Sequence, residues 1–369
     1  MKVLTVGGAM IDTIAIIENS AIERMSLLNA GQSFLLIEDG RKIEALDISM
    51  HCGGGAINTA IAFARLGWDT ATMVKLGDDR RAEQILARLD EERISTRWVT
   101  RDGSAPTGSS VLIASHDRNA GVFTFRGANT RLGVEDIDAR AFAVDLVYIA
   151  NLSNEAARAF PALVDAATAA GAAVACNPGT RQLHAHGAAF RETLSRIGIL
   201  SLNRHEAEDV LALLDIAPGA RLSAGEDPPL VFPHHMETPA LARRGLKSEG
   251  RALSLRAFFR ALIAAGVQSL VLTDGKDGAF AASRGDIIYC PAIPTDAAGT
   301  AGAGDAFGAT FAAYVAQGAP PATALSAAAL NASSVLGHID THTGLLRRSA
   351  LDGQLSESTS IPNVLGWPL

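Results

Sequence analysis

Short apolar runs alternate with longer stretches of helical spacing along most of the chain. Runs of this length, separated by helices, are typical of βαβ units. Strands joined in this way lie parallel in one sheet, and helices cover both of its faces. The pattern therefore predicts an α/β fold with a central, mostly parallel sheet. The apolar runs occupy residues 3–6, 146–149, 172–176, 199–202 and 269–273.

Polar or glycine-rich turns follow these runs, for example at residues 7–8, 177–179 and 203–206. The carboxyl ends of parallel strands meet at one edge of a sheet, and open α/β sheets bind their ligands there. We therefore expect these turns to lie close together at a binding site. Asp12 follows the first run and is a candidate ligand contact, although a solvated turn aspartate explains it equally well.

Two pairs of apolar runs are not followed by helices. Residues 34–37 and 43–48 flank Asp-Gly at 39–40, which is a strong hairpin signal. Residues 109–115 and 121–125 flank a second polar turn. These segments predict strands outside the main sheet, in a small covering sheet.

Composition narrows the class of protein further. The 369 residues are 48% hydrophobic and 19% charged, which provides enough core for one large α/β domain or for two domains. A net charge of −7 disfavours a nucleic-acid binder with a broad basic face. No apolar run approaches the ~18 residues of a membrane span, and the three cysteines form no C-x-x-C pair, so we expect a cytoplasmic protein without a membrane partner. Residues 215–250 are proline-rich and lack periodicity, and they predict an inserted surface loop.

The stretch G-T-A-G-A-G-D-A-F-G at residues 299–308 carries the clearest candidate chemistry. Its glycines precede an expected helix at 306–316, so backbone N–H groups of the first turn can bind an anion such as phosphate. A carboxylate beside a bound phosphate costs free energy, so the placement of Asp305 needs a reason. A general base that takes a proton from a hydroxyl would supply one. Capping of the helix explains the same aspartate. Residues 53–67 repeat the order of glycine turn and helix, and Asn58 there either binds a hydroxylated ligand or caps locally.

With these elements in order, the chain resembles the ribokinase-like, or PfkB, family of carbohydrate and nucleoside kinases over nearly all of its length. The first family signature is Gly-Gly followed by Asn and an alanine-rich helix ending in Leu-Gly, and residues 53–67 match it. The second, D-T-x-G-A-G-D, is matched at residues 300–305. The resemblance implies a single ribokinase-like domain over residues 1–369, built as a three-layer α/β sandwich. It also implies a β-sheet lid inserted at about 13–50 and 106–127.

The resemblance assigns roles to individual residues of three kinds. The catalytic positions are Asp305 as general base and Gly302, Ala303 and Gly304 as the anion hole for the transferred phosphoryl group. The sugar-binding positions are Asp12, Gly54 and Asn58. The nucleotide positions are Thr273, Gly275 and Gly278, with Asn331 near the adenine. The N-x-x-E residues Asn203 and Glu206 help to organise Mg²⁺ and phosphate, and Glu206 acts on the metal through water.

Three further expectations come with the resemblance. The lid closes over the sugar, and in many relatives it pairs two subunits, so a homodimer through the lid is expected. Arg126, after the second hairpin, either contacts an anionic or polyhydroxyl substrate or is solvated. The first Asp of the second signature, which contributes to the monovalent-cation site in K⁺-activated relatives, is replaced by Gly299, and Asp296 stands three residues earlier. We therefore expect weak or no K⁺ dependence, unless Asp296 loops back to take the place of that residue.

The leading hypothesis is an ATP- and Mg²⁺-dependent kinase that phosphorylates a hydroxyl of a small sugar or sugar acid. A nucleoside kinase is the nearest alternative, since Phe34, Phe123 and Phe125 in the lid segments offer apolar surface for a base. A ligand-binding relative that lost catalysis would keep the fold, but the intact Asp305 and glycine loop argue against it. A dehydrogenase is disfavoured because the first strand is not followed by G-x-G-x-x-G.

Overall fold

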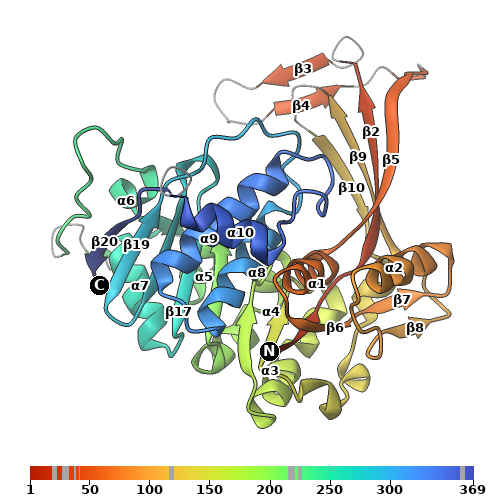
Figure 1. The fold of residues 1–369 in the computed structure, drawn as a ribbon, viewed down its shortest axis with the longest axis horizontal. Coiled ribbons are helices and arrows are strands. Elements are labelled where there is room, and N and C mark those ends of the chain that lie inside the picture. The colour runs from red at the N-terminus through yellow and green to blue at the C-terminus, as the bar shows by residue number, and fades with distance from the viewer. Residues whose placement is uncertain are drawn as a thin grey trace.

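A large mixed sheet forms the centre of the molecule. The computed structural model describes residues 1–18, 23–26, 33–36, 39–40, 42–115, 120–214, 221–222, 227–248, 250–357 and 362–369. Within these residues the sheet has nine strands (Figure 1). In spatial order they are β20 (Leu365–Pro368), β19 (Asp286–Cys290), β18 (Ala279–Ser283), β17 (Ser269–Thr273), β13 (Ile199–Asn203), β12 (Ala173–Cys176), β11 (Leu146–Ile149), β1 (Lys2–Val6) and β6 (Asp69–Met73). The six strands from β17 to β6 run parallel to one another, whereas β18, β19 and β20 each pair antiparallel with their neighbours. This arrangement confirms the predicted mostly parallel sheet.

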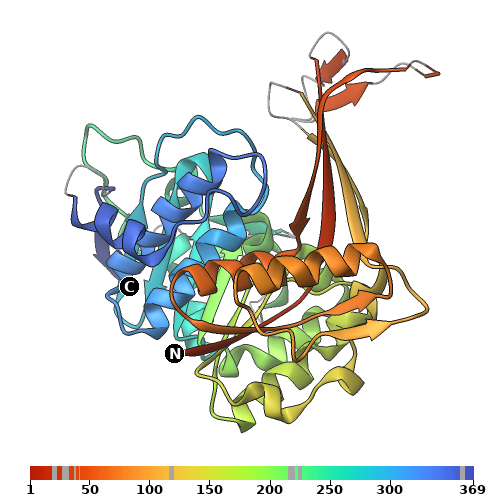
Figure 2. The ribbon, with the colours of Figure 1, turned by 45° about the vertical axis from the view of Figure 1, so that its right-hand side comes forward.

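Successive residues of the parallel strands enter two different cores. On β11, Leu146 and Tyr148 pack into one core, whereas Val147 and Ile149 pack into the other. Because both faces of the sheet are buried, the strands are continuous apolar runs rather than alternating ones. Figures 1 and 2 show the helix layers that close the two cores.

The helices divide between the two cores. The core of Leu146 is closed by α1 (Gly55–Arg65), α2 (Arg80–Glu91), α8 (Ala303–Ala316), α9 (Pro321–Leu336) and α10 (Arg348–Ser356). The core of Val147 is closed by α3 (Phe160–Ala169), α4 (Thr180–Thr193), α5 (Arg204–Leu213), α6 (Ala240–Arg244) and α7 (Leu255–Ala264). Of the helices in the described ranges, none is both long enough and apolar enough to span a membrane.

A second, smaller sheet stands away from the main body (Figures 1 and 2). Its order is β10 (Ala120–Phe125), β9 (Gly108–Ser115), β2 (Met10–Ile17) and β5 (Ala45–Gly53). The expected antiparallel pairing of 109–115 with 121–125 is confirmed by β9 and β10, while residues 116–119 between them lie outside the described residues. The expected small sheet outside the main sheet is therefore also confirmed.

The predicted hairpin around Asp39-Gly40 is wrong. The strand before it, β4 (Ser33–Leu36), pairs with β3 (Glu23–Ser26), and the strand after it, β5, pairs with β2. Residues 37, 38 and 41 beside the turn lie outside the described residues. A turn signal indicates where the chain reverses but does not determine the partner strand, and here β5 matches β2 along nearly its whole length.

Residues 215–250 are not a surface loop throughout. Their described part contains α6, β14 (Arg221–Leu222) and β15 (Leu246–Ser248), and both strands pair with β16 (Arg251–Leu253). Leu241 and Leu246 are buried in the main core, so this part of the segment is packed. The prolines obscure the helical and strand periods, but they do not prevent the residues between them from being buried. Residues 215–220, 223–226 and 249 lie outside the description.

Several short elements occur elsewhere in the described residues. They are the parallel pair β7 (Lys75–Gly77) and β8 (Thr100–Asp102) and the 3₁₀ helices at Gly127–Arg131, Val134–Asp136, Ala139–Phe142, Asn154–Ala159, Leu194–Arg196 and Gly275–Asp277.

Replacement of Leu246 by alanine tests whether this segment belongs to the core. Leu246 is 0% exposed, so we expect Leu246→Ala to lower the free energy of unfolding by about 2–5 kcal/mol. Val231 in the same segment is 71% exposed, and we expect Val231→Ala to change the free energy of unfolding by less than about 0.5 kcal/mol. Urea unfolding of both variants measures the difference. Equal tolerance of the two substitutions would show that the segment is a loop.

Candidate active site

The glycine-rich stretch at 299–308 forms the turn into α8. Gly302 is the residue before the helix, with a φ of 77°, and a Cβ there would lie 2.6 Å from the Cβ of Thr341. Only glycine fits this left-handed and crowded position. Asp305 is the third residue of α8, so it does not occupy the cap position. Within the described residues no side chain caps α8, which leaves its first N–H groups available to an anion.

The Asp305 carboxylate is held by α1. The side-chain amide of Asn58 donates to Asp305 Oδ2 at 2.7 Å. Burial raises the pKa of Asp305 to about 6, the hydrogen bond from Asn58 opposes that rise, and the charge of Asp12 adds to it. The carboxylate is therefore ionised at neutral pH, yet more basic than an ordinary aspartate, as a general base requires.

Asp12 approaches the same site from the small sheet. It lies on β2 rather than in a turn, and its Oδ1 accepts a hydrogen bond from the hydroxyl of Ser110 on β9. A Cβ on Gly53 would lie 2.0 Å from the Asp12 carboxylate, and one on Gly54 would lie 2.5 Å from the carbonyl oxygen of Gly8. The two glycines thus let β2 and α1 come close enough to bring Asp12 toward Asn58.

Asn151 is a residue of this site that the sequence reasoning missed. A Cβ on Gly55 would lie 3.5 Å from Asn151 Oδ1 and 3.7 Å from Asp305 Oδ1, so the two side chains meet above the start of α1. Asn151 follows the carboxyl end of β11. The expectation that turns after parallel strands line the site applies to it, and that signal could have found it.

Asn203 and Glu206 form a reciprocal cap at the start of α5. Asn203 Oδ1 accepts from the Glu206 amide at 3.0 Å, and Glu206 Oε2 accepts from the Asn203 amide at 2.9 Å. Asn177, a second residue without a predicted role, donates to Glu206 Oε2 at 3.0 Å. Burial, with a smaller contribution from the charge of Asp305, raises the pKa of Glu206 to about 7.

The donor set at Glu206 is small. In the part of the chain that the structure describes, no three His, Cys, Asp or Glu side chains cluster to hold a metal ion. Mg²⁺ commonly uses one or two carboxylates together with water and substrate phosphates. The buried Glu206 carboxylate, with Asp305 near enough to affect its pKa, fits a metal held in this way.

A cavity of about 580 Å³ opens beside the start of α8. It is lined by Thr273 at the end of β17, by Gly275 and Gly278 after that strand, and by Ala303 and Gly304 of α8. The remaining walls are mostly apolar and come from residues 290–297 and from α9. The cavity thus joins an apolar pocket to the N-terminus of a helix, which is the combination that an adenine and its phosphates need.

Asn331 does not line this cavity. It is buried, its Nδ2 donates to Thr310 Oγ1 at 2.8 Å, and its Oδ1 accepts from the Leu346 amide at 2.8 Å. Its neighbours Ala329 and Ala332 on α9 line the cavity instead. The side chain therefore joins α8 and α9, and the expected position of Asn331 near the adenine stays a prediction.

Arg126 is half-buried after β10. Its carbonyl oxygen accepts from the Asn129 amide at 3.2 Å, and burial together with the charge of Arg181 lowers the pKa of its guanidinium. Arg181 lies in the first turn of α4, two residues after Gly179, and a Cβ on Gly179 would lie 3.0 Å from the Cβ of Asn151. The start of α4, which carries Arg181, therefore lies next to Asn151, and Arg181 is near enough to Arg126 to affect its pKa.

Gly299 is enclosed by the chain after α9. A Cβ on it would lie 3.2 Å from the carbonyl oxygen of His338 and 3.4 Å from that of Ile339. The position supplies no side-chain oxygen, and these carbonyls occupy the space that a side chain would need.

A model of the pfkB family of carbohydrate kinases matches residues 2–347. The chain belongs to this family, whose sugar kinases are phosphotransferases with an alcohol group as acceptor. It is 25% identical to a deoxyribokinase of Salmonella typhi over 330 residues. This aligned region is 88% of this chain and 92% of that protein.

Two solved structures have the same fold. Arabidopsis thaliana ribokinase complexed with ribose and ATP matches with a TM-score of 0.70 and 21% sequence identity. The match covers 97% of this chain and 99% of the ribokinase chain. Burkholderia thailandensis nucleoside kinase in complex with inosine has a TM-score of 0.69 and 19% identity, covering 98% of this chain and 100% of its own. These likenesses confirm the ribokinase-like fold class.

The raised pKa of Asp305 predicts a pH-dependent cost in stability. Between pH 3.8 and about 6 the folded protein binds more protons at this residue than the unfolded chain, so stability falls as the pH rises through this window. Asp305→Asn cannot ionise, and we expect it to be more stable than the unaltered protein by about 1–2 kcal/mol at pH 8 but not at pH 4. Urea unfolding at both pH values measures this, with the exposed Asp286→Asn as the control. A gain that is the same at both pH values would rule out the burial of charge as its cause.

Proposed function

We propose that the protein is an ATP-dependent kinase that transfers the γ-phosphoryl group to a hydroxyl of a small sugar or sugar acid. The observation that carries the proposal is the position of Asp305. Its carboxylate lies at the N-terminus of α8, beside the cavity on one side and Asn58 on the other. A base there can take a proton from a hydroxyl while the helix N–H groups hold the phosphoryl group.

In this proposal the backbone N–H groups at Gly302, Ala303 and Gly304 stabilise the charge that develops on the phosphoryl oxygens. ATP occupies the cavity, with its phosphates at the start of α8 and its base against the apolar wall. Thr273, Gly275 and Gly278 lie along the nucleotide, in support of their expected role. Asn203 and Glu206 would hold Mg²⁺ through water, and the metal would neutralise phosphate charge when bound.

The acceptor occupies the space between the two sheets in this proposal. Asp12, Gly54 and Asn58 contact its hydroxyls, and Arg126 together with Arg181 receives a carboxylate if the acceptor is a sugar acid. The small sheet acts as a lid that excludes water during transfer.

The aromatic residues of the lid do not favour a nucleoside as the acceptor. Asp12 pairs with Ser110, which pairs with Thr124, so these three residues share one face of the small sheet. Phe123 and Phe125 alternate with Thr124 and therefore lie on the opposite face, and the side chain of Phe34 lies outside the description. The expected apolar slot for a base does not include Phe123 and Phe125.

A coupled assay of ADP release tests the proposed reaction. With ATP and Mg²⁺ against pentoses, hexoses, sugar acids, sugar phosphates and nucleosides, we expect turnover with a sugar or sugar acid. Asp305→Asn should lower kcat by about 10²–10⁴-fold because it removes the general base. Arg126→Gln should raise KM for an acidic acceptor without affecting KM for ATP. Turnover that survives in Asp305→Asn would refute the proposed role of Asp305, and turnover with nucleosides alone would favour a nucleoside kinase.

Monovalent cations should have little effect on this enzyme. Gly299 supplies no side-chain oxygen to a cation. Replacing tetramethylammonium with K⁺ at constant ionic strength should leave kcat nearly unchanged. A large, saturable rise with K⁺ would contradict this expectation.

The small sheet also supports the proposal of a homodimer. On the face opposite Asp12, Met50, Val111 and Phe123 form one row across β5, β9 and β10, and all three are exposed, Phe123 by 66%. Ile48 and Phe125 extend this apolar face. A monomer rarely exposes such a surface, and two copies related by a twofold axis would cover it with like residues.

We expect the protein to sediment as a dimer and Phe123→Lys to sediment as a monomer, since the lysine would be buried in the interface without a partner. The matched control is Val231→Lys, which places the same charge on an exposed apolar site of the main body. Analytical ultracentrifugation distinguishes the two states. A monomeric parent protein, or a dimer unaffected by Phe123→Lys, would exclude this interface.

A further inference from the structure

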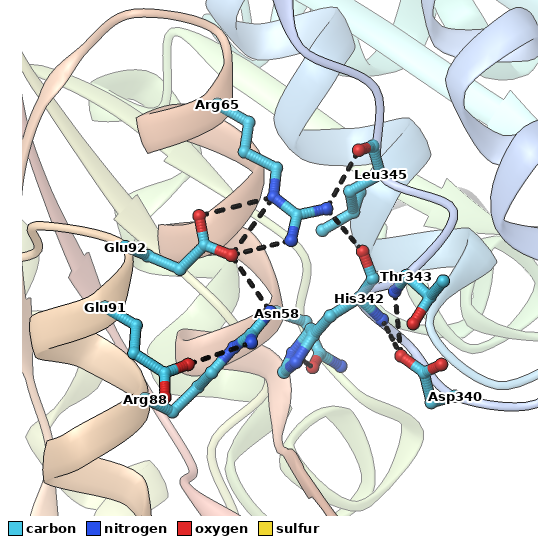
Figure 3. Close-up of polar contacts among 9 residues, drawn as sticks. All are labelled: Asn58, Arg65, Arg88, Glu91, Glu92, Asp340, His342, Thr343 and Leu345. Carbon is cyan, nitrogen blue, oxygen red and sulfur yellow. Dashed lines mark hydrogen bonds and ion pairs between the residues drawn. The ribbon is translucent and has the colours of Figure 1, made fainter.

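The segment between α9 and α10 contacts the side chain that holds Asp305. Asn58 Oδ1 accepts a hydrogen bond from Thr341 Oγ1 at 2.9 Å and lies 2.9 Å from His342 Nε2. Asn58 is 5% exposed and His342 is 4% exposed, so both contacts are shielded from water. Figure 3 shows the side chain of His342 pointing toward Asn58 on α1.

The hydrogen-bond directions follow from the acceptor on the far side. An ionised carboxylate only accepts, so the group that Asn58 presents to Asp305 is its NH₂. Its Oδ1 therefore faces the segment, and His342 must donate through Nε2–H. Burial, assisted by Arg88, lowers the pKa of His342 to about 3, so the imidazole is neutral at working pH. A single tautomer, with the proton on Nε2, satisfies this contact.

His342 is itself held by two sets of contacts (Figure 3). Asp340 Oδ1 accepts from the backbone amides of His342 and Thr343 at 2.7 and 2.8 Å. Arg65 Nη1 donates to the carbonyl oxygens of His342 and Leu345 at 2.5 and 2.9 Å, while its Nη2 pairs with Glu92 at 2.6 Å. Glu92 also pairs with Arg88 at 2.9 Å. The segment is thus fixed to α1 and α2.

We propose that His342 is a positioning residue that fixes the amide orientation of Asn58 and thereby places the acceptor hydroxyl against Asp305. A flipped Asn58 would turn Oδ1 toward the carboxylate, where both groups only accept. It would also force His342 into the Nδ1–H tautomer and make Thr341 accept, so the observed set of hydrogen bonds would be lost. In the observed orientation one N–H of Asn58 is used by Asp305, and the second can donate to the oxygen of the hydroxyl that Asp305 deprotonates. The inference rests on the proposed kinase function.

The consequence is a division of roles around Asp305. The helix N–H groups and the cavity act on the nucleotide, whereas His342 acts only on the orientation of Asn58 and hence on the acceptor and the base. Loss of the Nε2–H donor should therefore impair the acceptor side of the reaction and leave nucleotide binding intact. Loosened packing of the segment would not produce this selectivity.

Three variants test the proposal in the full-length protein with the acceptor found in the assay above. His342→Leu removes the donor at similar volume, His342→Gln restores an N–H donor, and Leu345→Ala loosens the same segment while keeping the backbone carbonyl that Arg65 contacts. For His342→Leu we expect kcat to fall about 10- to 100-fold and KM for the acceptor to rise, with KM for ATP unchanged. The acidic limb of its kcat profile should move to higher pH, because the bond from Asn58 that lowers the pKa of Asp305 is weakened.

The outcomes separate this inference from the proposed function. If the unaltered protein shows no phosphoryl transfer to any acceptor, the proposed function fails and the inference fails with it. If the unaltered protein is active, the inference predicts recovery in His342→Gln and an unshifted pH profile in Leu345→Ala. Unchanged kinetics in His342→Leu, or the same kinetic and pH changes in Leu345→Ala at equal loss of stability, would overturn the inference and leave the proposed function standing.

Discussion

A carboxylate held in a partly desolvated position is the constraint on which the rest of the site depends. Ionised Asp305 needs compensation for lost hydration, which here comes from the N-terminal end of α8 and from the amide of Asn58. The compensation is incomplete, because burial and the charge of Asp12 keep the pKa of Asp305 near 6. The same arrangement that destabilises the charge makes the carboxylate a better base. Stability is thus lower where the proposed chemistry needs reactivity.

The parallel sheet explains how residues far apart in the chain reach this carboxylate. Asn151 follows β11, Asn177 follows β12 and Asn203 ends β13, so three neighbouring strands deliver side chains to one edge. The small sheet adds Asp12 from the other side. Asn58 lies between these contributions, and the segment of His342 controls which way its amide faces.

Much of this architecture follows from local sequence features. The βα rhythm predicts the parallel sheet, and the glycines before α1 and α8 predict where the chain turns sharply into a helix. The structure explains why glycine occupies position 302, since a φ of 77° and the close Cβ of Thr341 leave no room for a side chain. Asp305 could be placed in the first turn of α8, but its bond to Asn58 spans 247 positions and is not a local property.

The features that escaped prediction depend on tertiary packing. The strand partner of β5 is chosen by β2, which lies far earlier in the chain, rather than by the Asp39-Gly40 turn. The orientation of Asn331 on a helix buried on most sides is set by Thr310 and Leu346 and not by spacing. The faces of Phe123 and Phe125 required the strand register. His342 carries no motif, and its contact with Asn58 is visible only in three dimensions.

The pH dependence of turnover at saturating ATP, Mg²⁺ and acceptor tests the central claim most directly. If Asp305 is the general base, kcat should fall on the acidic side with a midpoint near pH 6, the pKa that burial gives this carboxylate. The same limb should persist in Glu206→Gln, which removes the other carboxyl that titrates near neutrality. A kcat that stays level from pH 8 down to pH 5, or a limb that vanishes with Glu206, would contradict the assignment of Asp305 as the base.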